Sequence, residues 1–334
     1  MQRGPVKATR LLLVLSLFFV AMTLVGCAES LEFQNETGIV PTEATATKQK
    51  LVTVYYVTRE GNYLVPVNTE VPEGDDLCRH AVEKLLVGPQ DKELLSSPFP
   101  PGVLLKYVYV KDGRACVDLG GDAIGTMGPA AWQQALDSLA FTLTELPDID
   151  IKSVEVLING VLDNNTLLER PKYINLIPGG PEDGSAARVY FSYNDIYLVP
   201  VTVKVGCEAH GVLKATLEQL VAGPQGIPYL SAVFPEGTRL LDYQQEGGLV
   251  HLNFSQEAVL RDTKGSIRRD EQSPTIGALA LTLSAFPGID QFQILIEGKP
   301  LPDINYPIFV PRSYLDREWM KPLLDIPGAQ PKEG

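Results

Sequence analysis

Two hairpin patterns begin the two halves of the folded chain. β-Branched and aromatic residues fill Leu51–Val57 and Tyr63–Val71 on either side of a polar turn, and they fill Ala187–Tyr193 and Ile196–Val205 in the same way. Such runs around a short turn favour a β-hairpin. Both second strands contain the motif YLVPV, whose proline cannot donate a ladder hydrogen bond. We therefore predict that each second strand lies at a sheet edge or contains a bulge.

A helix with one apolar face is predicted after each hairpin. Leu85–Gln90 reads LLVGPQ and Leu220–Gln225 reads LVAGPQ, so both helices end at a Gly-Pro pair. Glycine adopts the left-handed conformation that ends many helices, and proline cannot continue one. The doubled motif is therefore a helix stop, and we place no active site there. The apolar stripes are Leu77, Ala81, Val82, Leu85 and Leu86 in the first half, and Val212, Thr216, Leu217, Leu220 and Val221 in the second.

The remainder of each half repeats as well. Val103–Leu119 and Thr238–Phe254 alternate around a turn that contains glycine, which favours a second hairpin. A long helix and a closing strand are predicted next in each half. The apolar helix positions are Leu136, Leu139, Leu143 and Leu146 in the first half and Ile276, Leu279, Leu283 and Phe286 in the second. The closing strands are Val154–Gly160 and Phe292–Gly298.

This order of elements predicts two copies of one β-β-α-β-β-α-β unit. A longer polar loop in the second copy, with matching elements on both sides, is typical of duplication followed by divergence. The predicted fold class is α+β, with two tandem homologous small domains, each a mainly antiparallel or mixed sheet with two helices packed on one face. The predicted boundaries are a lipoprotein signal peptide and lipidated cysteine at 1–27, a flexible tether at 28–50, a first domain at 51–177, a linker at 178–186, a second domain at 187–315 and a C-terminal tail at 316–334.

Composition narrows the class of partner. The chain has 334 residues, of which 45% are hydrophobic and 21% charged, which is ordinary for globular domains with real cores. Its formal net charge is −13. Binding to nucleic acid requires a clustered positive field, and this sequence contains none, so we expect no nucleic-acid partner.

The N-terminus has the layout of an export signal. Arg3, Lys7 and Arg10 precede an apolar run, and no acid interrupts it. The run ends in LVGC at Leu24–Cys27, which resembles the bacterial lipoprotein signal. Acyl chains on Cys27 would hold the protein at the membrane by burying CH₂ groups at about 0.8 kcal/mol each. A plain signal peptide with a chance cysteine and an uncleaved anchor are the alternatives. Removing residues 1–26 would leave a net charge of −16.

Three further cysteines remain, and their spacing indicates neither a disulfide framework nor a zinc site. They are Cys78, Cys116 and Cys207. An odd number in an exported protein leaves at least one thiol unpaired. A Cys78–Cys116 disulfide and two buried, apolar thiols both fit the first domain, so this point stays open.

Candidate catalytic residues are few. The histidines His80 and His210 stand near a helix start, and His251 should lie on the outer face of its strand. Asp118 and Asp122 form the best local acid pair, but the repeat counterpart of Asp118 is Asn253, which cannot carry a proton. An ordinary role at a strand end is therefore favoured for Asp118. We expect no catalytic constellation, no metal site and no cofactor.

The ordered set of motifs resembles the GerMN domain, the sporulation and spore germination module of spore-forming bacteria. The motifs are the LLxGP helix end, the FPxG turn at Phe99–Gly102 and Phe234–Gly237, the strands VDL and LNF, the helices at Ala135–Ile149 and Ile276–Ile289, and the closing INGVLD and IEGKPL. The resemblance covers about residues 51–170 and 187–310. It implies a protein held by lipid outside the cytoplasmic membrane, and it implies no shared catalytic residues.

The function expected from these observations is that of a membrane-anchored extracytoplasmic lipoprotein. It would act as an interaction and assembly module in sporulation or spore germination. Its partners would be membrane lipid through Cys27 and proteins of an envelope or sporulation complex, with peptidoglycan as an alternative partner. Two alternative functions remain open: an enzyme or accessory of cortex peptidoglycan remodelling, and a solute-binding lipoprotein.

Overall fold

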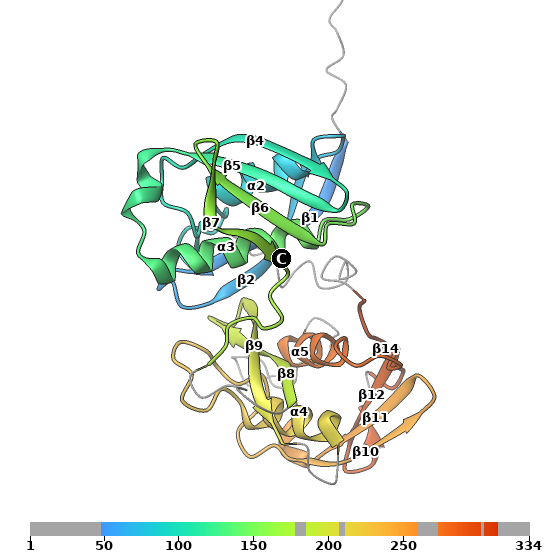
Figure 1. Ribbon diagram of the computed structural model, residues 1–334. Coiled ribbons are helices and arrows are strands. Elements are labelled where there is room, and N and C mark those ends of the chain that lie inside the picture. Colours follow the sequence, from blue (N-terminus) through green and yellow to red (C-terminus); the bar gives the residue numbers. More distant parts are fainter. Residues whose placement is uncertain (1–47, 178–184, 207–210, 260–272, 302–303, 313–334) are drawn as a thin grey trace, which may run out of the picture. The chain divides into compact units, whose positions relative to one another are not determined.

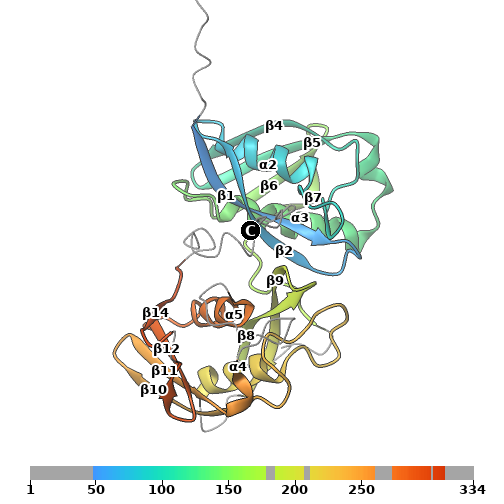
Figure 2. The same ribbon diagram turned by 180° about the vertical axis from the view of Figure 1, so that it is seen from behind.

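The computed structural model describes residues 48–177, 185–206, 211–259, 273–301 and 304–312, which all fall within one compact unit, Thr47–Gly334. Figures 1 and 2 show these residues from opposite sides, coloured along the sequence. The unit is built from two α+β halves of the same design, which confirms the predicted fold class of two repeated domains. The predicted signal peptide, Cys27, Cys207, His210 and nearly all of the predicted tether and C-terminal tail lie outside the described residues.

The first half opens with the predicted hairpin. Strand β1 (Gln49–Thr58) pairs antiparallel with β2 (Leu64–Pro72), and the short β3 (Leu95–Ser96) pairs with the other side of β1. The sheet order β2-β1-β3 places β2 at an edge, as its proline predicts. Pro66 lies opposite Tyr55 in this ladder.

A second sheet of four strands follows in the order β4-β5-β6-β7. The strands are β4 (Leu104–Lys111), β5 (Arg114–Gly120), β6 (Ser153–Ile158) and β7 (Val161–Glu169). Strands β4 and β5 form the predicted hairpin, while β5 and β6 run parallel. Both residues of the β4–β5 turn, Asp112 and Gly113, have positive φ, which matches the right-handed twist of the flanking strands.

Two helices pack on the inner face of this sheet. Helix α2 (Leu77–Val87) contacts β1, β2 and β4, and α3 (Pro129–Thr144) contacts β1, β6 and β7. The helices also contact each other. Helix α2 ends at Gly88, whose φ of 91° confirms the predicted glycine stop. Between β5 and α3 lies a short 3-10 helix, Asp122–Thr126.

The second half repeats this plan. Its first sheet is the hairpin of β8 (Ser185–Tyr193) and β9 (Tyr197–Val205). Its second sheet has the order β10-β11-β12-β13, with β14 also paired to β12, and β11 and β12 are parallel. The remaining elements are α4 (Gly211–Ala222), β10 (Leu240–Glu246), β11 (Leu249–Phe254), a 3-10 turn (Gln256–Ala258), α5 (Pro274–Leu283), β12 (Gln291–Ile296), β13 (Lys299–Pro300) and β14 (Ile308–Phe309).

The two halves also share a β-bulge at the same place in the second sheet. The register of β4 on β5 shifts between Leu105 and Tyr107, and the register of β10 on β11 shifts between Leu240 and Asp242. The extra residue is Lys106 in one half and Leu241 in the other. Because a bulge bends and twists its strand at one place, both edge strands are distorted at the same position.

The two halves contact each other through the edge strands that carry the prolines, β2 and β9. The side chain of Asn175 joins them: its Oδ1 accepts from the Leu64 N–H at 2.7 Å, and its Nδ2 donates to the carbonyls of Leu64 and Pro200 at 2.8 and 2.7 Å. Tyrosines add to this junction. Tyr63 donates to the Pro228 carbonyl at 3.0 Å, and Tyr197 donates to Asp91 at 3.0 Å. One amide thus pairs with backbone groups of both edges.

The structure settles the state of two thiols. Cys78 and Cys116 are free and buried, so the disulfide alternative is wrong and the buried-thiol alternative is confirmed. Cys78 belongs to the core beneath α2, and burial raises its pKa to about 11. Within the described residues no helix is both long and apolar enough to cross a bilayer.

Candidate interaction surface

Asp118, the leading acidic candidate, has a structural role. Its Oδ1 accepts a hydrogen bond from the backbone N–H of Gly160 at 2.9 Å. In the second half, Oδ1 of Asn253 accepts from the N–H of Gly298 at 2.8 Å. An amide oxygen therefore does in one half what a carboxylate oxygen does in the other. The strand-end role predicted for Asp118 accounts for its side chain, and its supposed partner Asp122 lies exposed on the 3-10 helix.

The described histidines are also placed as expected of structural residues. Nδ1 of His80 lies 3.0 Å from the Pro72 carbonyl. His251 lies half-buried on β11, while its neighbours Val250 and Leu252 are fully buried. Alternation along the strand therefore turns His251 away from the core. No group of three or more potential metal ligands occurs in the described part of the chain.

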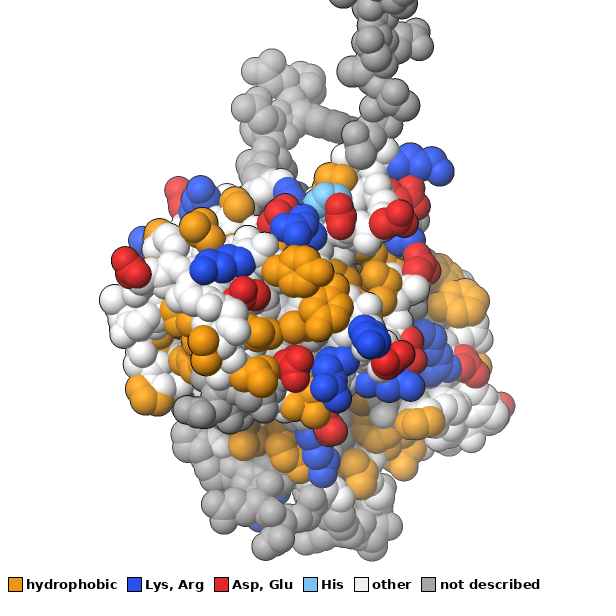
Figure 3. Space-filling model, turned by 45° about the horizontal axis from the view of Figure 1, so that its top comes forward, with side chains coloured by type: hydrophobic (Ala, Val, Ile, Leu, Met, Phe, Trp, Pro, Cys, Tyr) orange, Lys and Arg blue, Asp and Glu red, His pale blue; other side chains and the backbone are white. Residues whose placement is uncertain are grey.

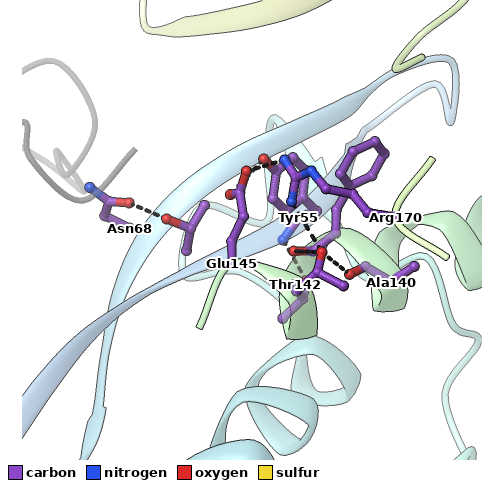
Figure 4. A network of polar contacts seen from close by, with 9 residues as sticks. Tyr55, Asn68, Ala140, Thr142, Glu145 and Arg170 are labelled. Atoms are coloured by element: carbon purple, nitrogen blue, oxygen red, sulfur yellow. Dashed lines mark hydrogen bonds and ion pairs between the residues drawn. The ribbon is translucent and has the colours of Figure 1, made fainter. Parts of the chain in front are cut away.

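A polar network fastens β1 to the end of α3 (Figure 4). Oε2 of Glu145 accepts from the Tyr55 hydroxyl at 2.7 Å, and Oε1 pairs with the Arg170 guanidinium. Arg170 also donates to Thr144 at 3.1 Å and lies 4.8 Å from the ring centroid of Phe141. Burial raises the pKa of Tyr55 well above its usual value, and the nearby Glu145 carboxylate adds to the effect.

Both carboxylate oxygens of Glu145 are thus occupied by partners within the protein. These contacts use the carboxylate to join parts of the first half to one another. The ring of Phe141 stacks on Tyr55 with centroids 5.0 Å apart, which closes the other side of the network. We assign it a role in holding the first half together.

The outer face of the β4–β7 sheet has a different character. Side chains of Ala115, Val117, Val154 and Val156 point inward and are fully buried, so their neighbours along β5 and β6 point outward. The helices of this half cover the inner face, and none of the described elements covers the outer one. Hydrophobic side chains nevertheless stand exposed there: Leu104, Tyr107, Tyr109, Leu162 and Leu167.

The exposure on this sheet is large. Among the fourteen large hydrophobic residues exposed in the described part of the chain, seven lie on β4 or β7; besides those just named they are Val110 and Val161. Leu104 is 63% exposed and Tyr107 55%. Figure 3 brings the β4 side of the first half forward and shows hydrophobic side chains gathered among charged ones. These residues lie along the two edge strands of the sheet, β4 and β7. Apolar exposure of this extent is a feature of interaction sites.

Tyr107 and Tyr109 lie at the β4 edge of this surface. Their ring centroids lie 5.4 Å apart, as expected for residues two apart on one strand face. A hydrogen bond with Cys116 on the neighbouring strand raises the pKa of the Tyr109 phenol, so its hydroxyl is neutral at physiological pH. We name this group, Leu104, Tyr107, Tyr109, Leu162 and Leu167, the tyrosine face.

Strand β10 of the second half can be compared with β4 position by position. Tyr107 lies opposite Asp118 in the ladder, and Asp242 lies opposite Asn253, so Tyr107 and Asp242 are equivalent. By the same register Gln244 replaces Tyr109 and Glu246 replaces Lys111. Strand β4 carries two lysines and no carboxylate, while β10 carries two carboxylates and no base. The same fold thus displays an aromatic, basic edge in one half and a polar, acidic edge in the other.

The sequence contains a signal for this surface. The strand LLKYVYVK was recognised as alternating, but its outer positions are aromatic, whereas those of LLDYQQE are polar or acidic. A strand with apolar residues on both faces predicts either burial on both sides or an exposed binding face. Comparing the two repeats position by position would have singled out Tyr107 and Tyr109.

Comparison with known proteins identifies the class of protein. The model of the Germane family, described as sporulation and spore germination, matches residues 53–163 and 188–302. The chain belongs to this family, as the order of its motifs predicted.

The sequence and the solved structure of one related protein are both similar to most of the chain. The spore germination protein GerM of Bacillus subtilis (strain 168) is 25% identical over 268 residues, which cover 73% of this chain and 71% of that protein. The solved structure of the tandem GerMN domains of the sporulation protein GerM from Bacillus subtilis superposes with a TM-score of 0.59 at 22% identity, covering 80% of this chain and 98% of that one. The structural likeness supports the tandem fold.

Proposed function

We propose that this protein is a lipid-anchored interaction module that works outside the cytoplasmic membrane in sporulation or spore germination. Its family and its similarity to a spore germination protein support the sporulation-related role. The LVGC motif supports the anchor at Cys27. The tyrosine face is the observation that carries the interaction role, because it exposes a group of apolar side chains on an otherwise well-packed domain.

An interaction role also agrees with the chemistry of the described residues. The leading acid, Asp118, serves a turn, and Glu145 is held by two partners. The related proteins are named as sporulation proteins and not as enzymes. A scaffold protein requires a binding surface and a fixed location. The tyrosine face is the candidate surface, and the lipid anchor at Cys27 is the candidate for the location. Two copies of the domain would raise the local concentration of any binding surface in an assembly.

The anchor is tested with Cys27→Ala in cells. We expect the wild-type protein to sediment with membranes and to incorporate labelled palmitate, and we expect the variant to do neither. Heat-resistant spore yield is measured in the same cultures. Normal yield from a strain that lacks the whole protein would contradict the sporulation role, whereas palmitate labelling of Cys27→Ala would contradict only the site of the anchor.

A cavity favours the solute-binding alternative as a second candidate. It measures about 570 Å³, and its described lining includes Lys172, Arg188, Ser185 and Thr202. Two cations and two hydroxyls would suit a small anion. Burial lowers the pKa of the Arg188 guanidinium, but the neighbouring Tyr190 and Tyr55 side chains raise it above its usual value. A thermal-shift screen of anionic metabolites tests this candidate. If none of them shifts the melting temperature of the wild type or of Arg188→Met, the candidate is rejected.

A further inference from the structure

We propose that β4 binds an extended, acidic segment of a partner protein, which adds as a strand beside β4 and places apolar side chains next to Tyr107 and Tyr109. This inference rests on the proposed interaction role and names the chemistry of the partner at that surface. It is carried by three properties of β4: a free edge, exposed aromatic side chains and an unbalanced positive charge.

The first property is the free edge. Strand β4 pairs only with β5 among the described residues, and it ends the sheet order β4-β5-β6-β7. A strand at a sheet edge presents unpaired N–H and C=O groups along its outer side. Strands β2 and β9 are also edge strands, but they contain Pro66 and Pro200 and contact each other. The edge strands β7 and β10 contain no proline, but they carry no basic residue. β4 contains no proline, and beyond the bulge at Lys106 it runs regularly from Tyr107 to Lys111.

The second property is the pair of tyrosines on that regular stretch. In strand addition the main chain supplies affinity, and side chains that alternate along the strand supply specificity. Tyr107 and Tyr109 present two neighbouring rings on one face, 55% and 43% exposed. Side chains two apart on an added strand would lie beside these rings on the same face of the sheet. Aromatic rings paired with β-branched or aromatic side chains across a ladder contribute about 0.2–1 kcal/mol each.

The third property is charge. Lys106 and Lys111 stand at the two ends of the tyrosine pair. Lys106 donates to the Asn159 side chain at 2.6 Å, and neither lysine forms an ion pair with a described carboxylate. Three acids lie nearby: Glu155 pairs with Arg114 at 3.6 Å, Asp118 accepts from the Gly160 N–H, and Asp112 follows Lys111 in the turn. Lysines and a bulge on an edge strand discourage the addition of strands in general. An acidic segment offsets the lysine charge, so charge complementarity favours an acidic partner.

The repeat shows that the fold does not require these side chains. The equivalent positions in β10 carry Leu241, Asp242, Gln244 and Glu246, and β10 keeps the same pairing and the same bulge. Tyr107, Tyr109 and Lys111 are therefore not needed to build the strand. An anionic membrane is a poorer occupant, because lipid cannot complete a strand ladder and the chain carries a net charge of −13.

The test selects peptides on the intact protein. A library of random peptides of about twelve residues is displayed on phage and selected on the full-length chain, and the peptides that bind are synthesised. We expect net negative peptides with apolar residues at alternate positions. Hydrogen exchange should show protection of the Tyr107–Lys111 amides when such a peptide binds. Selection without acidic enrichment, no selected binder, or protection elsewhere in the chain would overturn the proposal.

Matched variants separate the chemistry from folding. Lys106→Glu combined with Lys111→Glu should weaken the acidic peptides at least tenfold at low salt. Asp242→Lys combined with Glu246→Lys, at or near the same positions of β10, should change affinity less than twofold. Equal losses in both double variants would overturn the proposal. Circular dichroism tests whether both variants are folded. We expect that they are, because exposed charge reversals on an edge strand change stability little.

A second copy of the chain is the competing occupant, because β10 is itself an acidic strand. Light scattering of the full chain tests it. Self-association that Lys111→Glu abolishes, and that Glu246→Lys in the same chain restores, would assign β4 to a second copy and overturn the partner assignment. We expect Lys111→Glu to leave the oligomeric state unchanged.

Spore yield distinguishes strand addition at β4 from the proposed interaction function. Acidic peptides that bind β4 while Tyr107→Ser/Tyr109→Ser cells sporulate normally would leave the partner chemistry standing and contradict the proposed function of this face. The reverse result, lost spores with no acidic peptide selected, would leave the interaction role standing and reject strand addition by an acidic segment.

Discussion

Oδ1 of Asp118 accepts a hydrogen bond from the Gly160 N–H at 2.9 Å, and Asn253 makes the same contact with Gly298 in the other half. The acceptor oxygen is common to a carboxylate and an amide. Asp118→Asn should therefore change the free energy of unfolding by less than about 0.5 kcal/mol, whereas Asp118→Ala should cost about 1 kcal/mol by losing the bond. Urea denaturation measures both. A catalytic carboxylate would instead fail completely as asparagine, so spore yield that is lost in Asp118→Asn while its stability is unchanged would contradict the structural role.

Asn175 should couple the two halves. Its side-chain amide makes three hydrogen bonds that join β2 to β9, and its own φ is positive at 48°. Asn175→Gly removes the amide and tolerates that backbone conformation. We expect a loss of about 1–3 kcal/mol and a separation of the unfolding transitions of the two halves. Hydrogen exchange resolved by peptide measures each half. One transition, unchanged in midpoint, would show that the junction does not depend on this residue.

Alkaline pH should destabilise the first half through Tyr55. Burial raises the folded pKa of Tyr55 well above its unfolded value of about 10, so its contribution is complete below pH 10 and declines as pH rises above it. Tyr193 behaves in the same way: burial, and then the hydrogen bond to Glu60, raise its pKa to about 12. Unfolding free energy measured between pH 8 and 11.5 should therefore fall above pH 10.

Tyr55→Phe is the control for that decline. The variant loses the bond to Glu145 and should be less stable at pH 8, but its stability should fall less steeply above pH 10 than that of the wild type. A parallel decline in both proteins would show that Tyr55 does not contribute to the alkaline loss.

The two described thiols should be protected in the native protein. Cys78 and Cys116 are buried and free, and burial is the largest cause that raises the pKa of each. Alkylation at pH 8 followed by mass spectrometry should label both slowly in the native state and quickly in denaturant without reductant. Labelling of Cys78 and Cys116 only after reduction would indicate a disulfide and contradict the structure.

Periodicity predicted most of the fold. The hairpins, the glycine-terminated first helices and the long helices of both halves lie where apolar spacing placed them, because each buries one face against a common core. Strand β7 was missed, although Asn159-Gly160 before it is a strong hairpin signal and both residues have positive φ. The division of each half into two sheets could not be predicted, because it depends on which distant strands pair.

The exposure of the tyrosine face could not be predicted from the sequence. Alternation in β4 predicts a strand, but whether its outer side is covered depends on where the helices pack. In the structure α2 and α3 both cover the inner face, which leaves Tyr107 and Tyr109 exposed. The role of Asp118 was easier to predict, because the repeat places an asparagine at the equivalent position.

The central claim is that the tyrosine face of the first half, and not its counterpart in the second, performs the protein's interaction role. Heat-resistant spore yield is the most direct measurement, in cells that carry Tyr107→Ser/Tyr109→Ser or, as the matched control, Asp242→Ser/Gln244→Ser. With membrane abundance of both variants equal to wild type, we predict at least a tenfold loss of spores for the tyrosine variant and a normal yield for the control. Equal yields from the two variants would contradict the claim.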